Sequence, residues 1–329
     1  MRERSELTRW VPQGTVTAGG AGRLLPAADG WMAVSLPRVD DLDLLPAWLG
    51  LDPPAPDDDR VPWAAVADAL RPRDAEEAVA AGQELGLAVA VVADRARLTA
   101  GDEQLEARGT LDPARAPVRR QVAPPAPVGR GLEGMTVVDL SSLWAGPTCA
   151  RLLGRAGARV VKVESTTRPD GARFGNRELY ERLHAGQEER AIPFETDAGR
   201  AELRRVLADA DVVIEGSRPR ALARLGIEPD EVVAARPGAV WVSITAYGRT
   251  GPWRDRVGFG DDCAAAGGLV TWGADGTPAF VGDAVADPLT GMVAAAVVAR
   301  AVRDGGGVLL DVALREVARA AALGAELAW

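Results

Sequence analysis

The chain has 329 residues, 47% of them apolar and 26% charged, which is long enough for two domains with separate cores. The net charge of −9, without a dense Lys/Arg block, argues against nucleic acid as a partner, because such surfaces need clustered cations. The first ten residues lack an apolar targeting run and Met292–Val302 is too short to span a membrane, so we expect a cytoplasmic protein that does not bind membranes.

The cysteine and histidine content limits the possible metal chemistry. Cys149 and Cys263 both have apolar neighbours, which predicts core residues and gives no sign of a disulfide framework or a cysteine metal site. The single histidine, His184, lies among charged residues in ERLHAGQEER, so we expect a solvated side chain without a catalytic role. The sequence therefore predicts no metal centre.

Residues 1–110 are predicted to form a smaller α/β domain. A glycine-rich loop over Gly14–Gly22 (GTVTAGGAG) precedes a strand over Trp31–Leu36. This loop does not match a dinucleotide-binding fingerprint, because no strand leads into it and no helix follows directly. Apolar spacing then predicts three helices and a buried strand, over Asp41–Leu51, Pro62–Leu70, Arg73–Leu85 and Leu87–Val92.

Residues 111–134 differ in character from the segments on either side. This stretch, LDPARAPVRRQVAPPAPVGRGLEG, contains five prolines and shows no periodic apolar pattern. Such a composition is typical of an extended connection along a surface. We therefore predict that it is a linker and that the domain boundary lies there.

Residues 135–329 alternate between predicted strands and helices. The strands are runs rich in Val and Ile, at Met135–Leu140, Ala158–Glu164, Val212–Glu215 and Val240–Thr245. Helices are predicted at Pro147–Ala156, Thr196–Ala208, Pro219–Leu225 and Pro229–Ala235. Near-continuous apolar strands that alternate with helices are typical of a parallel sheet covered on both faces. The prediction is a Rossmann-like doubly wound parallel sheet domain beside the smaller α/β domain.

Two loops of the second domain are expected at its ligand-binding rim. Ligands of such sheets bind outside the carboxyl ends of the strands. Residues 141–144 (SSLW) follow the first predicted strand, and residues 216–218 (GSR) follow the third. No GxGxxG follows the first strand and no GxxxxGK[ST] occurs, which argues against nicotinamide binding and nucleotide hydrolysis.

Asp287 lies where a short apolar strand passes into a long Ala/Val helix, in FVGDAVADPLTGM. An Asp followed by Pro is a good helix start, with Asp287 as the N-cap and Pro288 at the first helical position. A plain capping role is one interpretation. The other is a nucleophile, because residues 282, 284 and 286 are Gly or Ala and leave room beside a carboxylate at the positive end of a helix.

Three motifs carry a resemblance to a known family. They are LEGMTVVDLSSLWAGPTCARLLGRAGARVVKVE with a downstream arginine at 168 or 173, ADVVIEGSRPRALARLG, and VSITAYGRTGP. Their order and spacing from Leu132 to about Ala320 resemble the class III CoA-transferases, also called the carnitine dehydratase and bile-acid-inducible family. The length of the match makes the resemblance specific.

The resemblance implies that Asp287 attacks the thioester carbonyl of an acyl-CoA and forms an aspartyl mixed anhydride. A carboxylic acid acceptor then takes the CoA, which is a substrate and not a permanently bound cofactor. By position in the family, the residues expected to bind CoA are Trp144, Ala145, Gly216, Ser217, Arg218 and Arg224. Arg224 is the strongest of these candidates, because a guanidinium suits phosphate.

The N-terminal segment resembles the second half of the same family, in RLLPAADGWMAVSL and VADRARLTAGDEQLEARG. By this resemblance, Gly19, Gly20 and Gly22 are candidates for a glycine-rich lid over the active site. The smaller domain follows the larger one in the family and precedes it here, which indicates a circular permutation or a tandem fusion cut between two active centres. Known members form interlocked dimers, so the resemblance implies a homodimer.

Two departures from the family leave alternative functions open. Residues 184–190 (HAGQEER) are acidic where the family often has cations, which would weaken CoA binding unless Arg173, Arg218 or Arg224 compensates. The family's α-methylacyl-CoA racemases use a histidine that aligns with Phe259, so a racemase would lack one base. Dehydratase or lyase chemistry and a non-catalytic partner subunit of an active homologue are the remaining alternatives.

Overall fold

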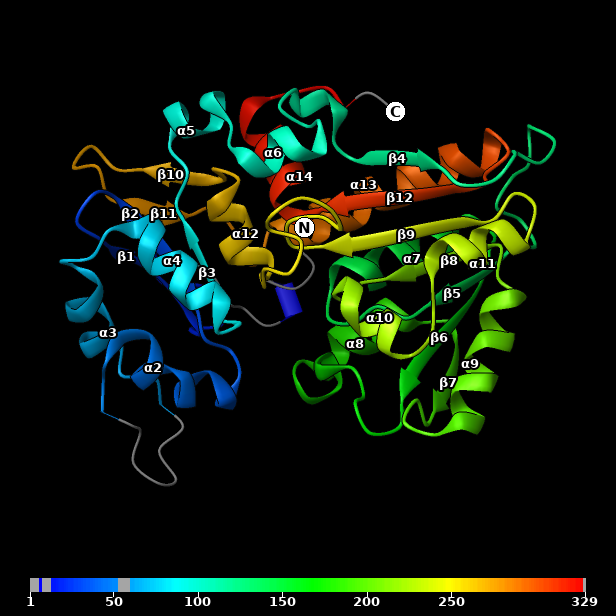
Figure 1. The fold of residues 1–329 in the computed structure, drawn as a ribbon, viewed down its shortest axis with the longest axis horizontal. Coiled ribbons are helices and arrows are strands. Elements are labelled where there is room, and N and C mark those ends of the chain that lie inside the picture. Colours follow the sequence, from blue (N-terminus) through cyan, green and yellow to red (C-terminus); the bar gives the residue numbers. More distant parts are fainter. Residues whose placement is uncertain (1–5, 8–12, 53–59, 328–329) are drawn as a thin grey trace.

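The computed structural model of the protein describes residues 6–7, 13–52 and 60–327. Two α/β units lie side by side, and Figure 1 shows the smaller one in blue and cyan at the left and the larger one at the right. The larger unit holds a mostly parallel sheet with helices on both faces. The predicted fold class is therefore confirmed.

The larger unit is built on a seven-stranded sheet with the strand order β4-β12-β9-β8-β5-β6-β7. Only β4, at one edge, is antiparallel to its neighbour among these strands. From β5 the chain adds strands on one side, and from β8 it adds them on the other. The topological switch point therefore lies between β5 and β8. The bounds are β4 Val118–Gln121, β5 Thr136–Asp139, β6 Arg159–Ser165, β7 Glu188–Ile192, β8 Val212–Glu215, β9 Val240–Thr245 and β12 Val308–Ala313.

Helices cover the two faces of this sheet, and each face has its own core. Successive residues of a strand point to opposite faces. Val137 accordingly joins the core under α7 and α13, which also buries Cys149 and Cys263 as predicted, whereas Val138 joins the core under α9. The helices of this unit are α7 Ala145–Arg155, η3 Gly171–Phe174, α8 Arg177–His184, α9 Asp197–Ala208, α10 Pro219–Arg224, α11 Pro229–Ala235, α12 Gly260–Ala266, α13 Ala286–Arg303 and α14 Leu314–Leu323.

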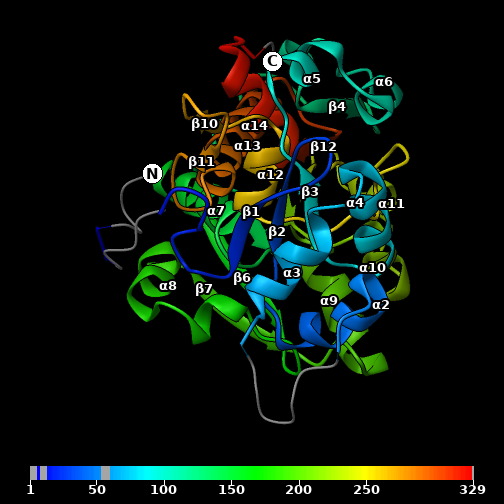
Figure 2. The same cartoon turned by 90° about the vertical axis from the view of Figure 1, so that its left-hand side faces the viewer.

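The smaller unit contains a three-stranded antiparallel sheet in the order β1-β2-β3. Figure 2 shows this sheet with α3 and α4 lying in front of it. Its core includes Met32, Val34 and Val89 from the sheet and Trp48 and Leu70 from the helices. The bounds are β1 Gly22–Pro26, β2 Trp31–Ser35, η1 Val39–Leu44, α2 Leu45–Leu49, α3 Trp63–Leu70, α4 Ala75–Glu84 and β3 Ala88–Val91.

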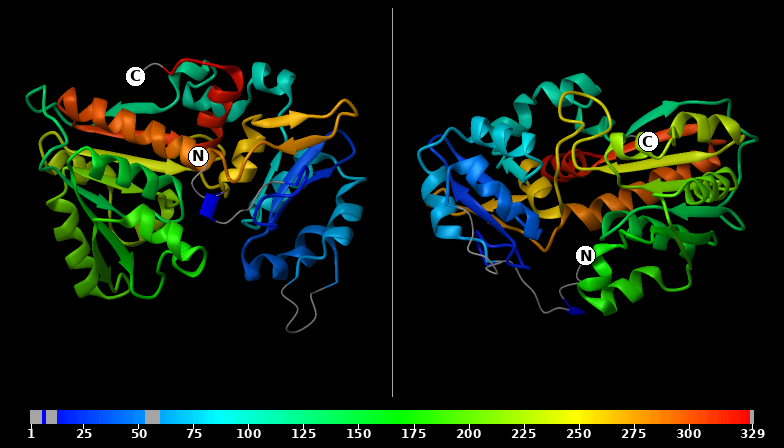
Figure 3. Two further views of the ribbon diagram at one scale, coloured as in Figure 1. Left: turned by 180° about the vertical axis from the view of Figure 1, so that it is seen from behind. Right: turned by 60° about the horizontal axis from the view of Figure 1, so that its bottom comes forward.

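Segments far apart in the sequence join the two units. Helix α12 and the hairpin of β10 (Val270–Trp272) and β11 (Pro278–Phe280) pack on the small sheet, where Ala265 and Phe280 share a core with Leu24 and Ala33. In the other direction, α5 (Arg95–Ala100) and α6 (Glu103–Arg108) lie beside α14, as the views of Figure 3 also show.

Two edge strands of the large sheet were not predicted. Strand β4 lies within the segment expected to be a linker, and it pairs with β12, while η2 (Pro113–Arg115) precedes it. Strand β7 lies in a segment for which no strand was predicted, and it pairs with β6. Gly216 therefore follows the fourth strand after residue 135 and not the third. The domain boundaries stay a prediction.

None of the helices in the described part of the chain combines the length and the apolar character that a membrane crossing requires.

Candidate active site

The crevice at the topological switch point brings the two predicted rim loops together. Ser141, Ser142 and Leu143 follow β5, and Gly216 and Ser217 follow β8. They line one cavity of 200 Å³, together with Ala145 at the start of α7 and Asp287. Seven of the residues expected from the sequence therefore line this cavity, at the place where doubly wound sheets bind ligands.

Asp287 lies in the first turn of α13 and is not its N-cap. The helix begins at Ala286 with Val285 as the cap residue, and the backbone N–H of Asp287 donates to the carbonyl of Ala284 at 2.9 Å. The expectation of an N-cap was wrong, because Val285 already has helical dihedral angles and moves the start two residues earlier. The positive end of the helix still favours a negative charge at Asp287.

Glycines set the position of this carboxylate. A Cβ added to Gly260 would lie 2.7 Å from Oδ2 of Asp287 and 2.5 Å from the carbonyl oxygen of Ala284. A Cβ on Gly291 would lie 2.5 Å from the carbonyl oxygen of Ala145. These approaches admit only glycine, so α13 packs directly on the start of α7 and Asp287 faces the rim loop.

A buried polar network holds the loop after β5. Lys162 on β6 has no exposed surface, and its Nζ donates to the carbonyl of Ser141 and lies 3.3 Å from Oδ2 of Asp170. The other oxygen of Asp170 accepts from the N–H of Leu143 at 2.9 Å, and Asp139 accepts from the N–H of Ser141 at 2.9 Å. These hydrogen bonds therefore fix the backbone of the loop between β5 and α7.

A second cavity, of 570 Å³, shares Leu143, Phe259 and Asp287 with the first as lining residues. Trp144, Leu179, Phe259 and Ala284 contribute to its walls, together with Gly19 and Gly22 of the glycine-rich segment. Leu143 and Ala284 have positive φ angles of 69° and 44°, which residues with side chains adopt only at a cost. Both of these strained positions lie beside Asp287. Gly20, the third lid candidate, is exposed and is not among the lining residues.

A third cavity, of 610 Å³, is called the basic cavity for its four arginines, but five acidic residues also line it: Asp40, Asp41, Glu84, Glu103 and Asp255. Arg38, Arg218, Arg220 and Arg256 line it, and Arg38 also lines the 570 Å³ cavity with Asp287. The pKa of Arg218 is lowered by burial and by the neighbouring guanidinium groups of Arg220 and Arg38. Guanidinium groups are suited to binding phosphate, and in this cavity they lie among carboxylates.

Arg224, the strongest candidate from the sequence, lies elsewhere. It is exposed in the last turn of α10 and does not line the three cavities that contain the other candidates.

Arg173, which was expected to compensate for the acidic residues of 184–190, ion-pairs with Glu164 at 2.9 Å and with Glu189 at 2.9 Å. Glu188 pairs with Arg159 at 2.6 Å. The acidic residues of β7 are thus neutralised within the sheet edge.

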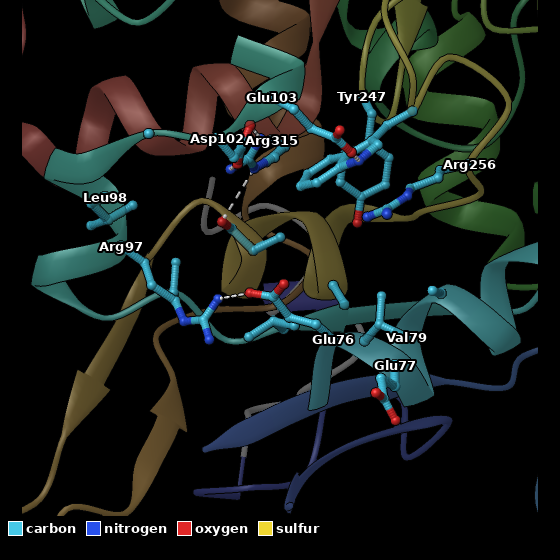
Figure 4. Close-up of a pocket in the computed structure, with 17 residues that line it drawn as sticks. Glu76, Glu77, Val79, Arg97, Leu98, Asp102, Glu103, Tyr247, Arg256 and Arg315 are labelled. Carbon is cyan, nitrogen blue, oxygen red and sulfur yellow. Dashed lines mark hydrogen bonds and ion pairs between the residues drawn. The ribbon is translucent and has the colours of Figure 1, made fainter. Parts of the chain in front are cut away.

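A fourth cavity, of 540 Å³, lies between the two units and is shown in Figure 4. It contains none of the candidate residues from the sequence. Two ion pairs lie among its charged side chains, Arg97 with Glu76 and Arg315 with Asp102. Arg256 and Trp253 separate it from the basic cavity, and the guanidinium of Arg256 lies 3.8 Å from the centre of the Trp253 ring.

His184 is buried, contrary to the expectation of a solvated side chain. It stacks on Tyr180 and contacts the carbonyl of that residue through Nδ1 at 2.8 Å. Burial lowers its pKa, which favours the neutral ring. Residue 184 is the last of α8 and is buried with Leu183, although residues 185 and 186, which follow it, are exposed. It is not among the residues that line the cavities with Asp287.

Among the described residues, no group of three or more His, Cys, Asp or Glu side chains is arranged to hold a metal ion.

The sequence did not predict Arg38, Phe259 or Leu179 as part of the site. Arg38 and Asp287 are 249 positions apart, and no motif links them. From the sequence, Phe259 was considered only because it aligns with the racemase histidine. That alignment could have predicted that Phe259 lies beside Asp287, as it does in both cavities.

Comparison with known proteins gives the family. The model of CoA-transferase family III matches residues 132–328, which is well over half of the chain, and the chain belongs to this family. Among solved crystal structures, the chain is similar to a CAIB/BAIF family protein of Brucella suis. The TM-score is 0.53 and the sequence identity is 30%, over 60% of this chain and 55% of that one. A hypothetical protein of Mycobacterium tuberculosis gives a TM-score of 0.55 and 28% identity over 60% and 58%.

Curated relatives are about one third identical. A succinyl-CoA–D-citramalate CoA-transferase of Chloroflexus aurantiacus is 32% identical over 200 residues, which cover 57% of this chain and 50% of that protein. A succinate–glutarate CoA-transferase of Agrobacterium fabrum is 31% identical over 205 residues, covering 56% and 51%. The chain thus spans about half the length of the curated relatives it matches.

Proposed function

We propose that the protein is a CoA-transferase that moves CoA from an acyl-CoA thioester to a carboxylic acid, with Asp287 as the nucleophile. The observation that carries the proposal is the position of Asp287 in the wall shared by two cavities. One lies at the switch point of the sheet and the other is largely apolar. A thioester carbonyl that meets the carboxylate there has space for substrate on both sides.

The chemistry follows from a carboxylate in this position. An oxygen of Asp287 attacks the thioester carbonyl, the C–S bond breaks, and CoA leaves as the thiolate with the electron pair. The thiolate then attacks the aspartyl carbonyl of the anhydride and releases the donor acid. The acceptor carboxylate repeats these steps in reverse order, so no proton and no further reactant is consumed.

We infer a site for the phosphates of CoA in the basic cavity from its arginines, which share the lining with five acidic residues. Arg38, Arg218 and Arg220 line it, and Arg38 also borders the cavity that contains Asp287. Such an arrangement lets the phosphates bind at one end and the thioester reach the carboxylate at the other. Gly216 and Ser217 precede Arg218 and line the switch-point cavity, and they are proposed to contact the substrate through their backbone.

Phe259 weighs against racemisation as the main activity. It lines both cavities beside Asp287, at the position where the racemases of the family have histidine, and it offers no base. The homodimer, the role of the glycine-rich segment as a lid and the permuted domain order stay predictions from the sequence resemblance.

Trapping with hydroxylamine tests the nucleophile. The purified protein is incubated with a panel of acyl-CoA thioesters and hydroxylamine, and peptide mass spectrometry locates the product. We expect a hydroxamate at Asp287, because hydroxylamine cleaves an anhydride, and no product in the Asp287→Asn variant. Asp275→Asn is the matched control, since this carboxylate lies in the exposed turn between β10 and β11, and it should leave the product unchanged.

Modification that persists at another residue in Asp287→Asn would contradict the assigned nucleophile. If no thioester gives a hydroxamate and CoA does not raise the melting temperature, the protein is instead a non-catalytic partner of an active homologue.

A further inference from the structure

The 570 Å³ cavity beside Asp287 has walls that are mainly apolar. Trp144, Leu179 and Ala284 belong to one buried hydrophobic cluster, and Leu143 and Phe259 add further apolar surface. They come from four separate elements or loops that converge on the nucleophile. Such a volume is typical of small-molecule sites and exceeds what a single acetyl group would fill.

The charges of this cavity do not suit a second carboxylate on the acyl group. Among the described residues, Arg38, Asp261 and Asp287 are the charged side chains that line it. Arg38 already donates to Asp41 at 2.8 Å and to the carbonyl of Gly86 at 2.8 Å, and it lies at the border with the basic cavity.

Asp261 adds negative charge in a fixed place. Its Oδ1 accepts from the backbone N–H of Ala284 at 2.8 Å, so the carboxylate is held in the cavity wall near the first turn of α12. An acyl group with a distal carboxylate would bring like charge toward Asp261, whereas an apolar chain would not. Each methylene buried in the cavity raises affinity about fourfold.

We propose that the site accepts thioesters of monocarboxylic acids with uncharged, apolar acyl chains and discriminates against dicarboxylic acyl groups. The curated relatives described above are named for succinyl-CoA and for dicarboxylic acids, so the substrate class of this chain differs from theirs. This inference rests on the proposed function for its biological meaning, but binding alone can test it.

Binding to the Asp287→Asn variant separates acyl recognition from the covalent step. Isothermal titration calorimetry compares hexanoyl-CoA, succinyl-CoA and free CoA on this variant of the full chain. Hexanoyl-CoA should bind at least about tenfold more tightly than succinyl-CoA, because its chain buries methylene groups that succinyl-CoA replaces with a charge. Equal affinities, or tighter binding of succinyl-CoA, would overturn the proposal.

Asp261→Asn tests the charge in the wall. Asparagine keeps an oxygen acceptor for the N–H of Ala284, so the loop contact survives. In the Asp287→Asn background, the ratio of hexanoyl-CoA to succinyl-CoA affinity should fall about tenfold, because one like-charge repulsion is removed. Asp275→Asn is the matched control, since this carboxylate lies in the exposed turn between β10 and β11 and should leave the ratio unchanged. An unchanged ratio in Asp261→Asn would contradict the role of Asp261.

A second variant, Ala172→Lys, tests the same charge preference in case Asp261→Asn does not fold. Ala172 lies in η3, is half-buried and lines the same cavity, so Ala172→Lys places a cation there. The affinity for succinyl-CoA should rise relative to that for hexanoyl-CoA, and the opposite change would count against the proposal. The tests also separate the two claims. If hydroxylamine traps nothing but the binding preference holds, only the nucleophile fails, and if no CoA thioester binds, both fail.

Discussion

Asp262 lies next to the residues that line the cavities of Asp287, and it has no exposed surface. Burial, together with the charge of Asp261, raises the pKa of Asp262 from 3.8 to about 7, although the N–H of Phe259 and the hydroxyl of Ser35 favour the ionised form. Between pH 3.8 and pH 7, the carboxyl of Asp262 therefore keeps its proton in the folded protein and loses it in the unfolded chain. The contribution to stability is therefore fully present below pH 3.8 and is lost as pH rises through 7.

Asp262→Asn should remove this pH dependence. The free energy of unfolding of the wild-type protein should fall by roughly 2 to 3 kcal/mol between pH 5 and pH 8 relative to that of the variant. Urea denaturation at several pH values measures the difference. A difference between the two proteins that is constant with pH would mean that Asp262 is ionised in the folded state.

Arg218 and Arg224 differ in their surroundings, which allows a comparison of two cations in one segment. Arg218 lines the basic cavity and Arg224 is exposed outside it. Arg218→Ala should raise KM for the acyl-CoA about tenfold with little change in kcat, because the lost contact is with a part of CoA that does not react. Arg224→Ala should change KM less. Steady-state kinetics with one thioester measures both effects. A larger rise in KM for Arg224→Ala than for Arg218→Ala would mean that the phosphates bind near Arg224 and not in the basic cavity.

The residues that could be predicted from the sequence are those in local motifs. The loop of residues 141–144, the segment Gly216–Arg218 and Asp287 each adjoin a recognisable strand or helix, so their place at the sheet rim follows from the fold class. Arg38 and Ser35 come from the smaller unit and reach the site only through tertiary packing, for which the sequence contains no local signal. The expectation of a solvated His184 was wrong because charged residues nearby in the sequence do not determine which face of α8 the side chain occupies.

At the scale of elements, strand β6 supports the loop that follows β5. Lys162 forms ion pairs with both Asp139 and Asp170, and all three side chains are buried. Lys162→Met would leave two carboxylates buried without this partner. We expect a loss of roughly 3 to 5 kcal/mol of unfolding free energy, because removing one member of a buried ion pair exposes the full desolvation cost of the other.

Arg159→Met on the same strand is the matched control for Lys162→Met. Its guanidinium pairs with Glu188 on the surface, where solvent screens the interaction, so the stability should change far less. Chemical denaturation of both variants measures the two effects. Similar losses would show that the charge of Lys162 does not support the loop.

The edge strands show why elements could be predicted only in part. The central strands are buried on both faces and are rich in Val and Ile, which is a strong signal. Strand β7 has four exposed residues, with the sequence EERAI, and β4 reads VRRQ, so neither has an apolar pattern. Both strands form because their backbones complete the hydrogen bonds of a neighbouring strand. This pairing depends on the rest of the sheet, so the sequence of the segment alone does not predict it.

At the scale of the whole molecule, the two units share a buried polar interface. Arg108 at the end of α6 contacts Asp311 on β12 and Glu316 on α14, and its side chain has no exposed surface. Gln104 donates to the carbonyl groups of Tyr247 and Thr250 at 2.7 and 2.8 Å. The walls of the 570 Å³ cavity come from both units, so this interface also sets the geometry around Asp287.

Breaking this interface should therefore uncouple the two units. Arg108→Met leaves Asp311 and Glu316 buried, and we expect a loss of roughly 3 to 5 kcal/mol of unfolding free energy. We also expect the wild-type protein to unfold in one calorimetric transition and the variant in two, because the small sheet has a core of its own. Arg115→Met, on an exposed side chain that follows α6, should leave the single transition in place. One unshifted transition in Arg108→Met would show that apolar contacts, such as those of α12 on the small sheet, suffice to hold the units together.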